Sequence, residues 1–86
     1  MDWNDPEVNP AGLKLVEDPR KSVPVIVAAR VLAHFKDASD NSFVFTSIGT
    51  ERKMFKATQG AYEEVNDTGL VFVAARMTDE LLNRRR

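Results

Sequence analysis

Val71-Phe72-Val73-Ala74-Ala75-Arg76 and Val25-Ile26-Val27-Ala28-Ala29-Arg30 are near copies of one another, separated by about half of the 86-residue chain. Either the chain contains a duplicated unit, or both stretches obey one packing rule, and the test is how far the likeness extends. Few of the flanking positions agree at the same offset. The two copies therefore indicate a shared rule, in which a Val-rich apolar run is followed by two alanines and by an arginine that leaves the core. We expect the copies to face each other or an equivalent surface.

The second copy leads into a segment with helical spacing. Four polar residues recur at i, i+3, i+4 and i+7, namely Arg76, Asp79, Glu80 and Asn83. Four apolar residues lie on the opposite side of such a helix, namely Leu70, Ala74, Met77 and Leu81. Two interpretations stay open: one helix from residue 70 to the end of the chain, or a strand over 70–75 followed by a helix that Thr78 caps.

Residues 66–76, Asn-Asp-Thr-Gly-Leu-Val-Phe-Val-Ala-Ala-Arg, resemble a helix of the bacterial RNA polymerase omega subunit. In that family an asparagine precedes a Leu-Val-x-Val-Ala-Ala-Arg stretch. The resemblance covers 11 residues, and the chain continues with Met77, Thr78 and Asp79 where the family has further basic residues. The resemblance implies that the second copy is helical, and it carries no function over to this chain.

The segment around the first copy, from Ser22 to Asp37, fits a helix better than a strand. Ser22 is a suitable N-cap, and Pro24 falls in the first turn, where its missing N–H costs little. Arg30, His34 and Asp37 then form one polar stripe at i, i+4 and i+7. The strand interpretation stays open, because the β-branched residues that begin the copy favour a pleated surface.

The middle of the chain is predicted to be a strand followed by a helix. Large apolar and smaller residues alternate over Ser42–Ile48, which predicts a strand that ends at Gly49-Thr50. An amphipathic spacing over Glu51–Val65, with Thr50 as N-cap, predicts a helix that Gly60 destabilises by about 1 kcal/mol. The alternative for this segment is a hairpin strand through Lys53–Ala57.

Residues 1–22 are predicted to form an acidic, proline-containing N-terminal arm. They hold three of the four prolines and five acidic side chains. Turns should therefore surround one short extended piece over Leu13–Val16. The remaining residues, 23–86, are expected to form a single small α+β domain, in which a short strand or hairpin packs with two to three helices.

Length and composition are typical of a small globular protein. The 86 residues suffice for one domain, and contents of 43% hydrophobic and 29% charged residues are ordinary for a folded chain. The chain has no cysteine, which excludes disulfides and thiolate chemistry. No apolar run is long enough to span a membrane, and a formal net charge of −1 gives no long-range field that would attract polyanions. We expect a cytoplasmic protein.

Few residues are suited to catalysis or to metal binding. His34 is the only histidine, so a metal site with three or four ligands is not expected. The four glycines are scattered singly, without the spacing of a phosphate-binding loop, and no serine lies in a Gly-x-Ser-x-Gly context. We expect neither an enzyme nor a cofactor.

These observations predict a non-enzymatic protein-binding module, such as an inhibitor, an adaptor or a subunit of an assembly, that binds another protein or a second copy of itself. Trp3 either packs back on the domain core or anchors a partner, since tryptophan is frequent among binding hot spots. The candidate partner-binding residues are Trp3, Arg30, His34 and Arg76. The alternative is a nucleic-acid-binding accessory protein that neutralises phosphates with basic side chains. Its candidate residues are Arg52, Lys53, Lys56, Arg84, Arg85 and Arg86.

Overall fold

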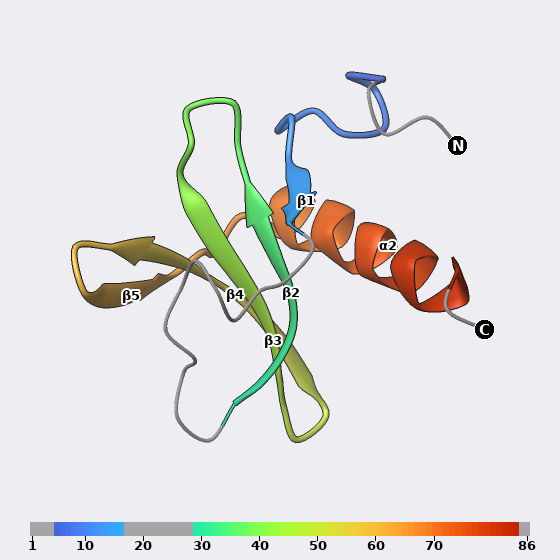
Figure 1. Cartoon of the computed structure of the whole chain (residues 1–86). Coiled ribbons are helices and arrows are strands. Elements are labelled where there is room, and N and C mark those ends of the chain that lie inside the picture. Colours follow the sequence, from blue (N-terminus) through green and yellow to red (C-terminus); the bar gives the residue numbers. More distant parts are fainter. Residues whose placement is uncertain (1–4, 17–28, 85–86) are drawn as a thin grey trace.

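The computed structural model describes residues 5–16 and 29–84, which form an antiparallel β-sheet and a helix (Figure 1). The elements are β1 (Lys14–Val16), β2 (Arg30–Lys36), β3 (Ser42–Ile48), β4 (Glu51–Thr58), β5 (Ala61–Glu64) and α2 (Thr68–Arg84). The strands lie in the sheet in the order β1-β2-β3-β4-β5. The sheet is therefore a meander, in which each of these strands pairs with its neighbours along the chain.

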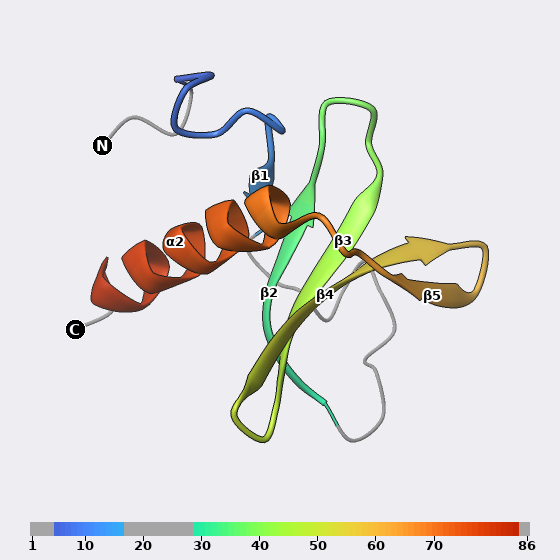
Figure 2. The same ribbon diagram turned by 180° about the vertical axis from the view of Figure 1, so that it is seen from behind.

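Helix α2 lies against one face of the sheet, as the view from behind shows (Figure 2). Its main contacts are with β2 and β3, and its C-terminal half runs outward past β1 and β2 (Figures 1 and 2). Asp67 is the N-cap of this helix, since its Oδ1 accepts a hydrogen bond from the backbone N–H of Leu70 at 3.2 Å. The cap fixes the point at which the chain leaves the sheet and enters α2.

The hydrophobic core lies between α2 and the sheet. Alternate residues of a strand point to opposite faces, and the face toward α2 carries large apolar side chains. The buried members of this cluster are Leu13, Ala33, Phe35, Phe43, Phe45 and Met54 from the sheet side and Val73, Ala74 and Met77 from α2. Phe35 and Phe45 are both 0% exposed, and burial of one such ring stabilises the fold by about 1.5–3 kcal/mol.

The opposite face of the sheet is also buried at its centre. His34 in β2 pairs with Val44 in β3, and Thr46 lies on the same face two residues further along. These three side chains are 0%, 1% and 0% exposed, respectively. Thr46 satisfies its hydroxyl by donating to the carbonyl oxygen of Lys53 at 3.2 Å. Because both faces are buried, β2 and β3 lack the regular apolar–polar alternation of a half-exposed sheet.

The prediction of a helix over Ser22–Asp37 is wrong for the residues of that segment that belong to strand β2, Arg30–Lys36. The strand is bulged between Val31 and Ala33, which adds a residue and disturbs the period of two. Arg30 thus begins a strand, whereas Arg76 lies inside a helix. The two copies differ in secondary structure at their arginines, and residues 25–28 of the first copy lie outside the described residues.

The prediction of a helix over Glu51–Val65 is wrong, and the hairpin alternative is confirmed. Strands β4 and β5 pair in antiparallel register, with Thr58 opposite Ala61. The two residues between them have positive φ, 40° at Gln59 and 83° at Gly60, which is typical of a type I′ hairpin turn. Gly60 therefore serves a tight turn and does not interrupt a helix.

The α+β class is confirmed, but the expected two to three helices are replaced by a five-stranded sheet and one helix within the described residues. The strand predicted at Ser42–Ile48 has the bounds of β3, and the extended piece expected at Leu13–Val16 contains β1. The single-helix interpretation of the second copy is confirmed by α2. Thr78 is no cap there, because its Oγ1 donates to the carbonyl oxygen of Ala74 at 2.9 Å in mid-helix. None of the helical segments that the structure describes is long and apolar enough to cross a membrane.

Candidate functional site

The side of α2 that faces away from the sheet carries two exposed large apolar side chains. Phe72 is 61% exposed and Leu82 is 49% exposed. Exposed Arg76 and Asp79 and the half-buried Ala75 lie between them along the helix. We call these five residues, Phe72, Ala75, Arg76, Asp79 and Leu82, the outer face of α2.

The outer face follows from the helical repeat. The residues that pack toward the sheet, Val73, Ala74 and Met77, occupy the opposite side of α2. Phe72, Ala75, Asp79 and Leu82 succeed one another at steps of three, four and three residues. This is the spacing of the seam along which two helices pack in a coiled coil. The outer face therefore has the geometry of a helix-packing surface, and among the described strands β4 reaches it through the side chain of Arg52.

Arg76 lies over the ring of Phe72, one helical turn away. The Cζ atom of Arg76 is 6.0 Å from the ring centroid, a separation at which an exposed cation–π contact contributes about 0.5–1 kcal/mol. Residues at i and i+4 are neighbours on a helix surface, so the spacing in sequence is sufficient to produce this contact. The pair presents an aromatic ring and a planar cation side by side to solvent.

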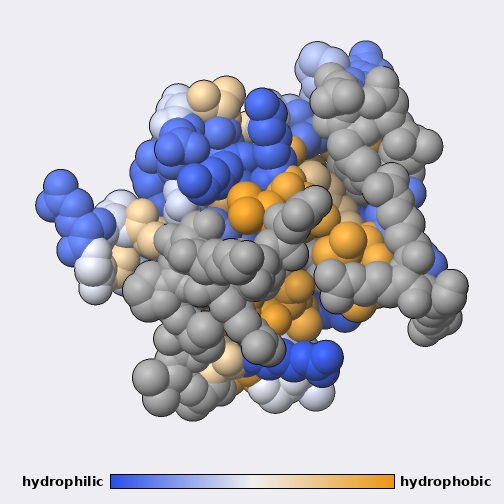
Figure 3. All heavy atoms as spheres, viewed as in Figure 1, coloured by the Kyte–Doolittle hydropathy of each residue, from blue (hydrophilic) through white to orange (hydrophobic). Residues whose placement is uncertain are grey.

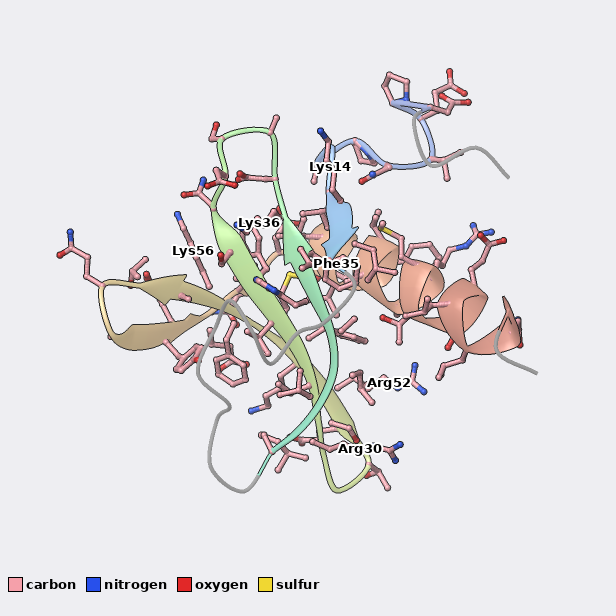
Figure 4. The ribbon with its side chains drawn as sticks, viewed as in Figure 1. Lys14, Arg30, Phe35, Lys36, Arg52 and Lys56 are labelled. Carbon is pink, nitrogen blue, oxygen red and sulfur yellow. The ribbon has the colours of Figure 1, made fainter. Side chains whose placement is uncertain are left out.

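Asp79 connects the outer face to strand β4. The Nη1 atom of Arg52 lies 3.7 Å from Asp79 Oδ1, and the two side chains are 50% and 60% exposed. Figure 4 shows Arg52 on the side of the sheet from which it reaches α2. An exposed pair of this kind contributes at most about 1 kcal/mol. Both charges therefore remain accessible to a further partner.

Of the four residues predicted to bind a partner, Arg76 alone belongs to the outer face. Arg30 is exposed at the start of β2. His34 is 0% exposed on the sheet face that points away from α2, so the sheet itself separates it from the outer face. Trp3 lies outside the described residues. The stripe of Arg30, His34 and Asp37 expected on a helix does not form, because these residues belong to a strand and the turn after it.

His34 is buried without a hydrogen-bond partner on either ring nitrogen. Its Cα partners in the neighbouring strands are Val16 and Val44, which are apolar. Burial lowers the pKa of His34 below its ordinary value, and the positive charge of Lys36 lowers it further. The ring is therefore neutral at neutral pH and is a packing residue of the sheet. The part of the chain that the structure describes contains no group of three or more His, Asp or Glu residues able to hold a metal ion.

The basic residues predicted to contact nucleic acid do not share one surface. The expectation of a common helix face depended on a helix over 51–65, and the segment is a strand. Lys53 therefore points to the sheet face opposite to that of Arg52 and Lys56. Its Nζ atom lies 3.7 Å from a carboxylate oxygen of Glu51 and 3.7 Å from one of Glu64.

The remaining basic residues are divided between the two ends of the sheet. Figure 4 shows Arg30 and Arg52 near one end, and Lys14, Lys36 and Lys56 near the other. Lys36 Nζ lies 3.4 Å from Asp40 Oδ1. Arg84 is the last residue of α2. Arg85 and Arg86 lie outside the described residues.

Sequence reasoning did not identify Phe72 and Leu82 as surface residues. Residues 71–75 were interpreted as uniformly apolar, and Leu82 was assigned to neither side of the helix. A signal for Phe72 was present. It precedes Arg76 by one turn, which places it on the polar side of the helix that also holds Asn83. A comparison of the chain with protein-family models, curated proteins and solved structures finds no match.

Proposed function

We propose that this chain is a non-enzymatic protein-binding module whose contact surface is the outer face of α2. The observation that carries the proposal is the 61% exposure of Phe72 on the side of α2 that the sheet does not cover. Aromatic residues and arginine are enriched in protein interfaces and among their hot spots, and here Arg76 lies over the Phe72 ring. Since the chain has no cysteine, the proposal includes an intracellular setting.

The packing of α2 against the sheet supports this proposal. Val73 and Ala74, next to Phe72 in the chain, are 5% and 0% exposed in the core. Asp67 caps the first turn of the helix. A surface held in this way needs little ordering when it binds, and less of the interaction free energy is lost as conformational entropy.

The experiment that tests the proposal is affinity purification from the native cell extract with quantitative mass spectrometry. Wild-type chain is compared with Phe72→Ala and with the matched control Ile48→Ala, since Ile48 is a large apolar residue that is 41% exposed on β3. We expect recovery of the bound protein to fall at least about tenfold with Phe72→Ala, equivalent to about 1.4 kcal/mol. Recovery with Ile48→Ala should equal that of the wild type. Equal recovery with all three chains would contradict the proposal.

A further inference from the structure

We infer that the outer face of α2 binds the same face of a second copy of this chain, with the two helices antiparallel about a two-fold axis. The inference rests on the proposed function and names its partner. In a two-fold dimer every contact occurs twice: if one residue of the first copy contacts a second residue of the other copy, that second residue of the first copy contacts the first residue of the other copy. The surface must therefore be complementary to itself, and the outer face can be tested for this property.

The residues along the outer face are arranged so that this face is complementary to the same face of an antiparallel second copy. When the axis crosses α2 at the level of Met77, Phe72 lies level with Leu82 of the second copy, and Leu82 with Phe72 of that copy. Each end of the contact then joins one exposed ring to one exposed leucine, 61% and 49% exposed in the single chain. Ala75 lies near the middle, where a small side chain lets the helix axes approach to about 8–10 Å.

The charges of Arg76 and Asp79 favour the antiparallel arrangement of the two α2 helices over the parallel one. In the antiparallel arrangement, Arg76 of each copy reaches Asp79 of the other, so that two opposite-charge contacts form. In a parallel arrangement, Arg76 meets Arg76 and Asp79 meets Asp79, and such like-charge contacts disfavour the complex. The internal contact between Asp79 and Arg52, at 3.7 Å between exposed side chains, does not bury the carboxylate.

The position of α2 leaves room for a second helix. Its C-terminal half runs outward past β1 and β2 in both views of the ribbon (Figures 1 and 2). Figure 3 shows the side of the molecule opposite to the outer face, where apolar and hydrophilic surface lie next to one another. A helix that protrudes in this way is approached by its counterpart before the two sheets meet.

The contact is short, so the expected affinity is modest. Residues 72–82 extend over about 15 Å of helix, at about 1.5 Å per residue. A contact of this length buries less than the roughly 800 Å² per partner of a standard interface. We expect a dissociation constant of about 10–500 μM and a dimer that forms only at high protein concentration.

Sedimentation equilibrium of the purified chain, from about 10 μM to about 1 mM, measures this association. The apparent mass should rise from that of the monomer toward that of the dimer. Phe72→Ala should raise the dissociation constant at least about tenfold, which is about 1.4 kcal/mol, whereas Ile48→Ala should leave it unchanged. A wild-type chain that remains monomeric at about 1 mM overturns the inference.

A charge exchange tests the antiparallel direction independently. Arg76→Glu and Asp79→Lys each place like charges opposite one another in the antiparallel dimer, so each variant alone should associate at least about tenfold more weakly. A mixture of the two variants restores both opposite-charge contacts and should form a heterodimer of about wild-type affinity. A mixture that stays monomeric, with both variants folded by circular dichroism, overturns the antiparallel pairing.

The two proposals fail separately. If the wild-type chain is monomeric at about 1 mM but recovery of a different protein from extract still depends on Phe72, the second copy is the wrong partner and the proposed function stands. If recovery does not depend on Phe72 and the purified chain is also monomeric, both proposals fall. Dimerisation that depends on Phe72 and on the charge exchange supports both.

Discussion

The side chain of Asn9 is hydrogen-bonded to both backbone groups of Leu13. Asn9 Nδ2 donates to the carbonyl oxygen of Leu13 at 2.9 Å, and the N–H of Leu13 donates to Asn9 Oδ1 at 3.2 Å. The two residues are 5% and 3% exposed, and the loop between them turns at Gly12 with a φ of 61°. One buried amide thus closes the loop that brings Leu13 into the core and β1 to the edge of the sheet.

Asn9→Ala should lower the free energy of unfolding by about 2 kcal/mol, because it removes two hydrogen bonds that contribute about 1 kcal/mol each. Urea denaturation followed by circular dichroism measures this change. Glu7→Ala, in the same segment but exposed, is the matched control and should change stability by no more than about 0.5 kcal/mol. Equal stability of the Asn9 variant and the wild type would show that the amide does not hold the loop.

Stability should fall in mild acid because of His34. Its pKa is lowered in the folded chain by burial and by Lys36, so the unfolded chain binds the proton at a higher pH than the folded chain does. The stability that neutral His34 contributes is therefore fully present above the pKa of about 6.5 that histidine has in the unfolded chain. This stability is lost as the pH falls below that value, by up to about 1.4 kcal/mol per pH unit. His34→Leu removes the titrating group and should flatten the curve of unfolding free energy between about pH 7.5 and about pH 5.5. Parallel curves for the two proteins would exclude His34 as the cause.

The β4–β5 turn should respond in opposite directions to two substitutions. Gly60→Ala places a Cβ atom on a residue with a φ of 83° and should destabilise by about 1–2 kcal/mol. Gln59→Asn puts a residue that tolerates positive φ at a position with a φ of 40°, and should stabilise by a few tenths of a kcal/mol, roughly 0.3–0.5. Thermal denaturation measures the change in stability of each variant relative to the wild type. Two changes of the same sign would show that the stability of this turn does not follow the preferences of a type I′ turn.

Phe72→Ala should leave the fold nearly intact. The ring is 61% exposed, and the substitution removes little buried area while it improves helix propensity. The free energy of unfolding of the dilute, monomeric chain should therefore change by less than about 1 kcal/mol. Met54→Ala, at a position with 0% exposure, is the contrasting variant and should cost about 2–5 kcal/mol. A large loss of stability with Phe72→Ala would mean that the outer face belongs to the core.

Nucleic-acid binding by the basic residues should be weak and sensitive to salt. Arg52 and Lys53 lie on opposite faces of β4, and each has a carboxylate 3.7 Å away. A single nucleic acid strand would therefore meet few of the basic side chains at once, and the affinity should be lost by about 150 mM salt. Fluorescence anisotropy with a labelled oligonucleotide checks this, and tight binding at that salt concentration would revive the nucleic-acid alternative.

The strand β3 and the helix α2 were predictable because each obeys a single local rule. Residues Ser42–Ile48 alternate in size and end at a glycine, and α2 has polar residues at i, i+3, i+4 and i+7. The helix begins at Thr68, two residues before the predicted start, because the capping role of Asp67 was not inferred from the sequence. In these segments, local propensity and tertiary environment favour the same structure.

The strands β2 and β4 were mispredicted because their environment overrides the local pattern. His34 and Phe35 are adjacent, and both are buried, on opposite faces of β2. A strand buried on both faces shows no alternation, so its apolar residues also satisfy a helical template. In β4–β5, Gly60 was counted as a cost to a helix, although glycine also readily adopts the positive φ that a two-residue hairpin turn requires. The outer face of α2 was not predicted for a related reason. Phe72 belongs to the apolar stretch over residues 71–75 but lies on the polar side of the helix.

The meander topology has a consequence for the order of events during synthesis. From β3 to β5, each strand pairs with the strand that precedes it in the chain, so these hairpins can close over short loops as soon as their residues are available, with low contact order. The core side chains of α2, among them Val73 and Met77, come last along the described chain. Until they arrive, Phe35 and Phe45 lack the cover of α2. A ribosome that pauses before α2 therefore presents a half-finished sheet with an uncovered apolar face, which is the stage at which this chain is most exposed to chaperones, proteases and aggregation.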